Sequence, residues 1–450
     1  MRAARLYQCG SLRYTRCGIV MLFFWILWGD FCLVLLENTR PVIVPLLLRS
    51  HEASNFTIGL LCGSIPPLLN FIVNPVISTA SDRTRTRWGR RIPYLMCGIP
   101  FVSMFLILLG FSDQIGGWLA HLVLGKEAVV APFVIGVLAV FSVGFLFFDL
   151  FAGCVYYYLF SDVVPKELLG RFMGFFRMAG SCGGLLFNLL VMPYVQTHMT
   201  IVCIMIAVIY ILGFGSMCLN VKEGEYPPPE PAGEKFTDKI ILYFRECFSM
   251  PFWLITFFGL GLNYVSIVCR QLFNLLYAIE TLHMTTAQYG RIMACGSVVL
   301  VSLAVPLGFL VDRFHPLRMI IAAMWLVIGA NIFGFFFCHD YVTFFITSML
   351  LTVVYAMQTS SGLPLAISLF PRNQFGQFSS ANAMVKAIML VLANAVGGWF
   401  IDLFGYQYIF VWDFLFTFIA VLLLHWVYRR WKQLGGEKGY VAPTIAIRRT

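Results

Sequence analysis

Six ionisable side chains lie within stretches of the sequence that are otherwise apolar. A charge in hydrocarbon is costly unless it is paired or faces a water-filled cavity, so these residues are the first candidates for function. Carboxylates accept hydrogen bonds from neighbouring hydroxyl groups, and a guanidinium donates them in a fixed fork, which is the chemistry that a polyhydroxy solute requires. The six residues are Asp30, Asp149, Arg177, Arg270, Lys386 and Asp413.

Three of the six, Asp30, Asp149 and Lys386, lie near the middle of their apolar stretches, where a side chain cannot easily reach the membrane surface. For these three we favour a functional role over a purely structural ion pair. Arg270 and Asp413 lie closer to the ends of their stretches, and for both we favour the interpretation that they extend to the lipid headgroups over a functional role. Because acids and cations both occur, charge pairing between helices is also open.

The stretches that carry these residues are long enough to cross a membrane. The mean hydropathy of the chain is +0.84 and only 12% of its residues are charged, which excludes an ordinary soluble protein. Twelve apolar stretches have about the length that a bilayer requires, so the sequence predicts an all-α integral membrane protein. They cover residues 18–38, 55–80, 93–112, 132–160, 172–196, 199–219, 251–279, 287–311, 318–338, 341–370, 377–403 and 406–428.

Basic loops follow the second and the eighth of these spans. The first reads Ser-Asp-Arg-Thr-Arg-Thr-Arg-Trp-Gly-Arg-Arg, from Ser81 to Arg91, and an Asp-Arg pair again follows a proline-bearing span half a chain later. Two matching loops indicate two parallel repeats. In this feature the chain resembles the major facilitator superfamily, whose members carry an Asp-Arg loop after the second and the eighth helix. Besides fixing topology, the loops are expected to latch a gate through Asp82, Arg83, Arg90, Arg91, Asp312 and Arg313.

A polar segment at residues 220–250 separates the two halves, and it contains Tyr-Pro-Pro-Pro-Glu-Pro at 226–231. A proline run cannot continue a helix and favours a semi-rigid linker. We therefore expect six-helix halves at residues 1–219 and 251–450, with a short amphipathic helix over 237–247 on the inner membrane face.

Positive charge sets the expected orientation. The predicted outer loops hold four of the 31 Lys and Arg residues and three more lie within spans, so the other 24 lie in predicted inner segments. This bias places both termini in the cytoplasm, in a plasma membrane or a bacterial inner membrane, and it explains the formal charge of +10 without a nucleic-acid partner. The four outer cations are Arg40, Arg49, Lys126 and Arg291.

A closer resemblance begins at the first basic loop, which continues as Ile-Pro-Tyr. The loop is similar to that of the glycoside–pentoside–hexuronide:cation symporters, which include the melibiose symporter, and its Gly-Arg-Arg-x-Pro sequence also occurs in plant sucrose carriers. The similarity covers most of the N-terminal half and, more weakly, the eleventh span. It implies that Asp30, Asp149 and Arg177 bind sugar from the first, fourth and fifth helices, and that Lys386 lies beside a cation site.

Two departures from that group bear on coupling and on sugar binding. The sodium-coupled members present two carboxylates one turn apart on the second helix, and this chain has Asn70 and Asn74 there. Asn offers a carbonyl oxygen but no charge and no titratable proton, so we doubt a strong Na⁺ site and expect H⁺ coupling if there is any. Gly153 stands where the melibiose symporter has a tryptophan, and Tyr157 is our candidate to supply aromatic surface instead. An aromatic belt at the membrane surface is the alternative for this tyrosine.

The C-terminal half adds polar candidates for a central cavity. Asn263 and Arg270 in the seventh span can share one helix face, and Gln358 begins a polar run in the tenth span that precedes Pro364. The run predicts a locally broken helix that lines the cavity.

Together these features predict a secondary transporter of the major facilitator fold that works by alternating access, with a sugar or glycoside as solute. The alternatives are a lysolipid or other amphiphile, an uncoupled facilitator with Lys386 in place of the cation, and a transporter-like receptor. No nucleophile–base pair, phosphate loop or metal-ligand cluster is visible, so we expect no enzyme, no cofactor and no metal. The 13 cysteines are scattered and predict neither disulfides nor a metal site. We expect a monomer in the lipid bilayer.

Overall fold

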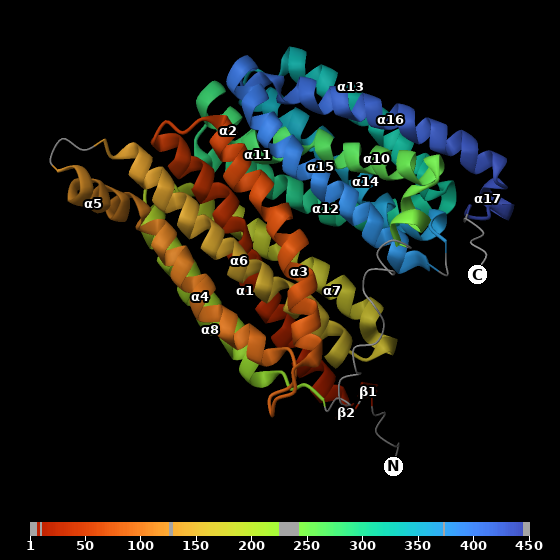
Figure 1. Ribbon diagram of the computed structural model, residues 1–450, viewed down its shortest axis with the longest axis horizontal. Coiled ribbons are helices and arrows are strands. Elements are labelled where there is room, and N and C mark those ends of the chain that lie inside the picture. Colours follow the sequence, from red (N-terminus) through yellow and green to blue (C-terminus); the bar gives the residue numbers. More distant parts are fainter. Residues whose placement is uncertain (1–6, 10, 126–128, 225–242, 372–373, 444–450) are drawn as a thin grey trace. The chain divides into compact units, whose positions relative to one another are not determined.

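The computed structural model describes residues 7–9, 11–125, 129–224, 243–371 and 374–443, with a few helical positions described by their backbone alone. The chain divides into two compact units (Figure 1). Unit 1 consists of Met1–Ser54, Leu68–Glu230 and Thr285–Ala294, and unit 2 of Asn55–Pro67, Pro231–Met284 and Cys295–Thr450. The main division therefore falls between residues 230 and 231, while two short segments belong to the opposite unit from their neighbours in sequence.

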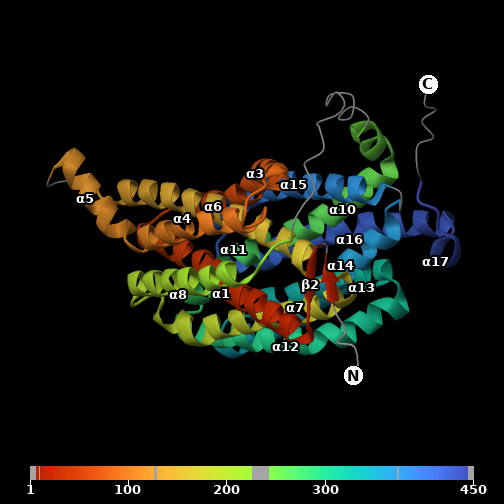
Figure 2. The ribbon, with the colours of Figure 1, turned by 90° about the horizontal axis from the view of Figure 1, so that it is seen from below.

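Unit 1 is built on long apolar helices that pack side by side. Helix α4 packs against α6 and α8, and α1 packs against α7 and α8, as Figures 1 and 2 show. Many exposed side chains of these helices are large and apolar, as expected for side chains that face hydrocarbon. The helices of this unit are α1 (Arg16–Ser50), most of α3 (Ile65–Arg83), α4 (Ile92–Gly110), α5 (Ser112–Leu124), α6 (Ala131–Val163), α7 (Leu169–Leu186) and α8 (Met199–Asn220).

Unit 2 has a core of aromatic side chains. Trp253 and Trp431 are buried in one cluster with Phe257, Phe370 and Phe378, and the ring centroids of Trp253 and Phe378 are 4.8 Å apart. Such edge and tilted ring contacts stabilise helix packing beyond the apolar area they bury. The helices of this unit are α2 (Asn55–Ile58), α10 (Pro251–Ser266), α11 (Val268–Leu276), most of α12 (Thr286–Phe314), α13 (Pro316–Phe337), α14 (Tyr341–Leu369), α15 (Phe375–Phe404), α16 (Ile409–Gln433) and α17 (Gly436–Gly439).

Eleven helical segments of the described chain are long and apolar enough to cross a membrane, and each overlaps one predicted span. The remaining prediction, 287–311, coincides with the 29-residue helix α12. Three spans contain a π-helical stretch, at Gly59–Ser64, Phe187–Val191 and Tyr277–Thr281. A π-helical turn inserts an extra residue into a helix, and such turns are frequent at functional sites.

The first span is longer than predicted, and this changes two assignments. Helix α1 continues for 35 residues to Ser50 and contains Pro41 and Pro45. The predictions that Arg40 and Arg49 lie in an outer loop are therefore wrong: both are part of α1, and Arg40 is only 8% exposed. Arg291, which was also predicted in an outer loop, lies in α12 (Thr286–Phe314). Sequence reasoning ended the span at the first cluster of polar residues, whereas the apolar pattern resumes directly after them.

The start of the second span packs against α15, within unit 2. The Asp402 carboxylate accepts hydrogen bonds from the backbone N–H groups of Asn55 and Phe56, both at 2.9 Å, and from the Asn55 side chain at 2.8 Å. Gly59 and Gly63 lie directly against Asn394, where a Cβ atom on either glycine would clash. The glycines thus let the π-helical turn approach α15 at backbone distance.

Two small elements were not expected from the sequence. Strands β1 (Tyr7–Cys9) and β2 (Leu12–Tyr14) form an antiparallel hairpin directly before α1, which Figure 2 shows beside the start of that helix. Helix α5 follows α4 at once and exposes Trp118 and Leu122, as a helix lying in a membrane surface would.

One further prediction is wrong, and one lies outside the described residues. Helix α14 is continuous from Tyr341 to Leu369, so the expected break near Pro364 does not occur. The hydroxyl groups of Thr359 and Ser361 bond to carbonyl oxygens of the preceding turn, which lets the helix carry these polar residues without unwinding. The proline linker and most of the expected amphipathic helix fall within residues 225–242, which are not described; residues 243–248 are helical.

Candidate functional site

Two carboxylates lie on the same face of α1 in unit 1. Asp30 and Glu37 are seven residues apart, which places them two turns apart on one face, about 10 Å along the helix axis. Asp30 is 1% exposed, whereas Glu37 is exposed. A carboxylate buried as deeply as that of Asp30 destabilises an apolar bundle unless a partner or a ligand compensates its charge.

Helix α6 brings a third carboxylate to the same region. The Glu37 carboxylate lies close enough to Asp149 and to Asp30 to interact electrostatically with both. The hydroxyl group of Tyr157, two turns further along α6, lies within electrostatic range of all three acids. Tyr157 is 51% exposed, so part of this residue is accessible to a ligand.

The cation nearest to these acids is Arg40. Its guanidinium lies in electrostatic contact with Asp149, and its Nε donates to the Ser142 hydroxyl oxygen at 3.4 Å. Arg40 is one turn beyond Glu37 on α1, so α1 and α6 together hold three acids and one base. We call this group the acidic site; it consists of Asp30, Glu37, Arg40, Asp149 and Tyr157.

The acidic site contains hydrogen-bond acceptors without donors. Asp30 Oδ2 and Asp149 Oδ1 are both buried, and the described part of the chain offers neither of them a hydrogen bond. An unsatisfied buried oxygen costs about 1–3 kcal/mol, and more when it is charged. A ligand that brings hydroxyl donors, or a proton, would remove that cost.

Arg177 lies beside this site but has no described ion pair with it. Its side chain on α7 is exposed. One turn further on, Gly180 borders Asp30, whose Oδ2 lies 3.5 Å from the place of a Cβ on that glycine. The absence of a side chain at Gly180 leaves room beside the Asp30 carboxylate. The sugar-binding role predicted for Arg177 stays a prediction.

Unit 2 contains a buried ion pair between Arg270 on α11 and Asp413 on α16. Arg270 Nε lies 3.3 Å from Asp413 Oδ2, and the other guanidinium arm donates to the amide oxygen of Asn331. Tyr355 donates to Asp413 Oδ2, and Thr417 donates to Oδ1 at 3.2 Å. The interpretation that Arg270 and Asp413 extend to the headgroups is therefore wrong, because both are enclosed and paired. The predicted solute contact of Arg270 would compete with these bonds.

Lys386 on α15 is held differently from the other buried charges. Its ammonium lies 4.1 Å from the ring centre of Tyr264, a cation–π contact, and the described residues supply no acid to it. The amide oxygen of Asn382, one turn earlier on the same face, is buried without a hydrogen bond. Elsewhere in this unit Gln358 donates to Asn263 Oδ1 at 3.1 Å, so these two predicted solute ligands bind each other.

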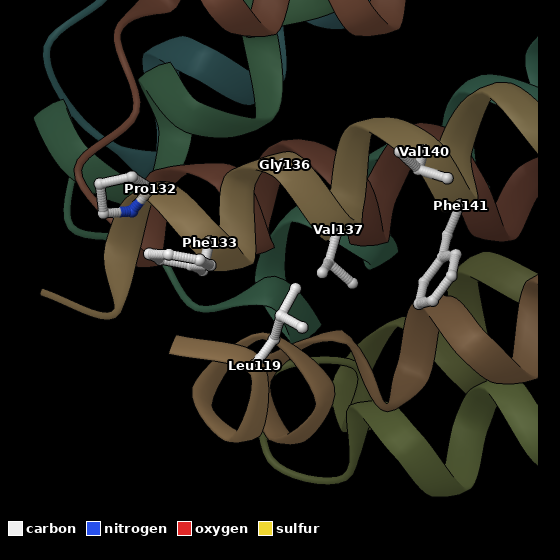
Figure 3. Close-up of a pocket in the computed structure, with 7 residues that line it drawn as sticks. All are labelled: Leu119, Pro132, Phe133, Gly136, Val137, Val140 and Phe141. Carbon is white, nitrogen blue, oxygen red and sulfur yellow. The ribbon is translucent and has the colours of Figure 1, made fainter. Parts of the chain in front are cut away.

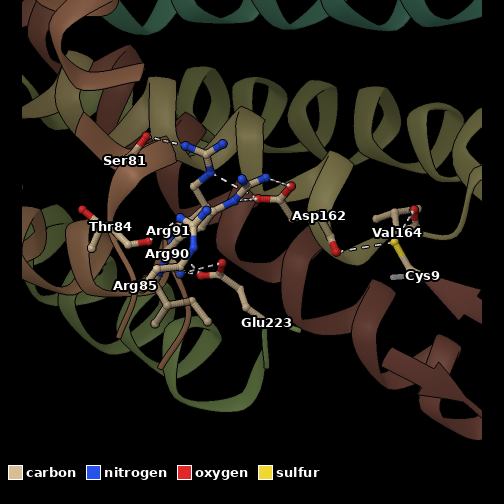
Figure 4. A network of polar contacts seen from close by, with 10 residues as sticks. Cys9, Ser81, Thr84, Arg85, Arg90, Arg91, Asp162, Val164 and Glu223 are labelled. Carbon is tan, nitrogen blue, oxygen red and sulfur yellow. Dashed lines mark hydrogen bonds and ion pairs between the residues drawn. The ribbon is translucent and has the colours of Figure 1, made fainter. Parts of the chain in front are cut away.

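The first basic loop is held by acids from α6 and from the segment after α8 (Figure 4). Arg90 Nε and Arg91 Nε donate to Asp162 Oδ2 at 2.9 and 3.2 Å, and Arg91 also donates to Ser81. The Glu223 carboxylate accepts from three successive backbone N–H groups at the start of α4, those of residues 90, 91 and 92, at 2.6–3.0 Å. The loop is therefore an ordered polar network.

The matching loop of the second repeat is described only in part. The side chains of Asp82, Arg83 and Asp312 lie outside the described set. Arg313 is exposed, and its guanidinium lies 5.6 Å from the ring centre of Phe314. The gating roles predicted for all these residues stay predictions.

Asn70 and Asn74 on α3 differ in environment. Asn70 is exposed, whereas Asn74 Oδ1 accepts a 2.6 Å hydrogen bond from the Tyr158 hydroxyl group. The Tyr158 ring in turn lies 5.1 Å from the Arg91 guanidinium. Asn74 is thus linked through Tyr158 to the basic loop, and its oxygen is already occupied.

The groove between α5 and α6 is a poor place for a polar solute. It has a volume of about 490 Å³ and is lined by Leu119, Pro132, Phe133, Gly136, Val137, Val140 and Phe141, as Figure 3 shows. None of these seven side chains can donate or accept a hydrogen bond. The described residues contain no cluster of His, Cys, Asp and Glu that could hold a metal ion.

Sequence reasoning missed Glu37 and Arg40. The spacing itself was the available signal: an acid seven residues after Asp30 and a base three residues later share one helical face. The span boundary hid it, because both residues were assigned to the end of the first span or beyond it.

The fold and the charged helix faces define a multi-pass membrane transporter. The chain belongs to the MFS/sugar transport protein family, whose profile matches residues 47–423. This match confirms the resemblance to the major facilitator superfamily and the all-α membrane fold.

The curated relatives align over a short segment. The sucrose transport protein SUT1 of Oryza sativa subsp. japonica is 36% identical over 73 residues, which is 16% of this chain and 13% of the relative. The sucrose transport protein SUC3 of Arabidopsis thaliana is 36% identical over 67 residues, and a membrane-associated transporter protein of Mus musculus 38% over 53. The aligned part of the chain thus spans about an eighth or less of the length of these relatives.

Solved structures share the fold over nearly the whole chain. A bacterial homologue of the human lysosomal transporter Spinster matches with a TM-score of 0.68 and 13% identity, covering 92% of this chain and 97% of that one. A bacterial homologue of the iron transporter ferroportin matches with a TM-score of 0.70, also at 13% identity, over 91% and 99%. At such identities the similarity extends to the fold alone.

Proposed function

We propose that this chain is a secondary transporter of a sugar or glycoside, driven by H⁺, with the acidic site as its solute and proton site. The observation that carries the proposal is the pair of buried carboxylate oxygens, on Asp30 and Asp149, that have no donor in the described chain. A sugar presents neighbouring hydroxyl groups, each of which can donate one hydrogen bond to such an oxygen. The Tyr157 ring offers an apolar surface beside them.

Proton coupling follows from the charge balance of the acidic site. Three carboxylates face one arginine, so ionising all of them leaves an excess of negative charge in an apolar bundle. A proton on one carboxylate removes that excess and moves with the solute when the site changes access. Asn70 and Asn74 carry no charge, which argues against Na⁺ as the driving ion.

The family match and the short alignments to sucrose transport proteins support a sugar as solute class. The family resemblance also supports alternating access between two repeats. The positive-charge bias of the loops supports cytoplasmic termini.

The test measures binding and uptake in purified protein. A thermal-shift screen against mono- and disaccharides and glycosides identifies a ligand, since a ligand that binds the folded state raises its melting temperature. Asp30→Asn, Glu37→Gln and Asp149→Asn should then each weaken binding by roughly tenfold to a hundredfold, the loss of about 1.5–3 kcal/mol expected for a charge-assisted hydrogen bond.

Asp113→Asn serves as the matched control, because Asp113 is half-exposed on α5 and pairs with His51. Its ligand affinity should equal that of the unmodified protein. Unchanged binding in all three acidic-site variants, with folding intact, would refute this site assignment.

A further inference from the structure

A groove at one end of unit 1 combines cations with apolar side chains. It has a volume of about 520 Å³ and lies where the first basic loop meets α4 and the end of α8. Its walls include Arg87, Trp88, Met96, Leu219, Lys222 and Glu223. We name it the basic groove.

The two cations that line the basic groove have no ion-pair partner among the described residues. Within the described chain neither Arg87 nor Lys222 has an acidic partner, and the Arg87 guanidinium only lies 5.5 Å from the Trp88 ring centre. The one carboxylate in the groove, Glu223, is bound by three backbone N–H groups of the loop and the first turn of α4. The groove therefore offers two free cations to an anion.

The side chains next to these cations suit a lipid. Trp88 is 48% exposed and Leu219 is 70% exposed. Tryptophan prefers the headgroup level of a bilayer, where its ring is apolar and its N–H can find a partner. Leu219 belongs to a stripe of exposed apolar side chains along α8, whose other members are Ile201, Met205, Val208 and Leu212.

We propose that the basic groove is a binding site for an anionic phospholipid, with the phosphate between Arg87 and Lys222 and an acyl chain along α8. The groove has room for a phosphate-sized group, and a basic pocket at the end of a membrane helix is the expected receptor for such a headgroup. A free organic phosphate would find the same cations, but it would leave the apolar stripe uncovered. The stripe and Trp88 therefore favour the lipid.

The site also reaches the polar network of the loop. Arg87 and Trp88 lie between Ser81 and the two arginines that bind Asp162. A phospholipid bound here stabilises the loop in its ordered form, so the ligand should raise the melting temperature of the protein.

The experiment titrates detergent-purified protein with phosphatidylglycerol and counts bound lipid by native mass spectrometry. The double variant Arg87→Gln/Lys222→Gln should bind about 30-fold more weakly, which corresponds to about 2 kcal/mol. The matched control is Arg13→Gln/Arg16→Gln, which removes two exposed cations, one in β2 and one at the first residue of α1, that lie outside the groove. Its affinity should stay within about threefold of that of the unmodified protein.

Two further arms make the result decisive. Phosphatidylcholine should bind at least tenfold more weakly than phosphatidylglycerol, and glycerol phosphate, which has the same anion without acyl chains, should not displace the lipid. Equal losses in the groove variant and the control would show a general surface attraction and overturn the proposal. Displacement by glycerol phosphate at equal concentration would instead show a site for a soluble anion. Melting temperatures measured without lipid check that all variants are folded.

Discussion

The buried pair of Arg270 and Asp413 supports a sharp test of whether an intramembrane charge is structural. The perturbation is Asp413→Asn, which keeps the shape of the side chain and removes its charge. In the structure Asp413 is completely buried and accepts from Arg270, Tyr355 and Thr417. The guanidinium of Arg270 also lies 4.8 Å from the ring centre of Phe410, and its side chain is only 11% exposed.

The expected magnitude follows from the charge left behind. Removing one partner of a buried ion pair costs about 3–5 kcal/mol, because the other charge remains desolvated and unpaired. For a unit of roughly 200 residues this corresponds to a fall in melting temperature of roughly 6–20 °C. The double variant Arg270→Met/Asp413→Asn removes both charges, so it should lose only about 1 kcal/mol for each neutral hydrogen bond. The double variant should therefore be more stable than Asp413→Asn by about 2–4 kcal/mol.

The assay is thermal unfolding of the single and double variants in the same detergent, followed by solute binding. Because the donors of Arg270 are already used by Asp413 and Asn331, we expect the double variant to bind solute within about threefold of the unmodified protein. Additive destabilisation by the two substitutions would refute the ion-pair argument. A stable double variant that no longer binds solute would show that Arg270 is a solute ligand, as the sequence predicted.

Three other predictions use separate parts of the chain. Replacing Na⁺ by K⁺ or choline should leave uptake unchanged, because Asn70 and Asn74 offer no charge, while a protonophore should abolish accumulation; strong Na⁺ stimulation would contradict this. Asp402→Asn should speed hydrogen exchange of the backbone amides of Asn55 and Phe56 about tenfold or more, because one acceptor oxygen is replaced by an amide donor. Unchanged exchange rates would show that the Asp402 carboxylate does not protect these amides. Glu223→Gln should lower the free energy of unfolding by about 1–2 kcal/mol, because the carboxylate accepts from backbone N–H groups at the start of α4. Glu437→Gln, at an exposed surface ion pair, should change it by less than about 0.5 kcal/mol, and equal effects of the two substitutions would refute a stabilising role for Glu223.

The membrane fold could be predicted because bilayer thickness imposes a length that a hydropathy pattern reveals directly. Each of the twelve predicted spans overlaps a long helix of the structure. Helix ends were less predictable, since Pro41 and Pro45 are tolerated inside α1 and polar residues interrupt its apolar pattern. The unbroken α14 shows the same effect: hydroxyl groups bonded to their own helix remove the reason for a break.

Side-chain partnerships were the least predictable part of the candidate site. Sequence reasoning favoured a functional role for Asp30 and a position near the headgroups for Arg270. The structure instead pairs Arg270 with Asp413 and Asn331, and it leaves Asp30 Oδ2 without a hydrogen-bond donor among the described residues. Arg40 was missed for a related reason, because its neighbour Asp149 lies on a different helix more than a hundred residues away. The N-terminal hairpin has too few residues to leave a periodic pattern.

The contrast between these two kinds of buried charge carries the functional argument. A charge kept for structure should be matched on every side, as Asp413 is, because each unmatched oxygen destabilises the folded protein. Asp30 Oδ2 and Asp149 Oδ1 are buried at the same expense and are not matched. Their cost persists in the protein without ligand and is recovered only when donors arrive, so binding energy is concentrated at the site that we propose for the solute and the proton. A transporter needs this property, since a site fully satisfied by its own side chains would gain nothing from binding and could not drive a change of access.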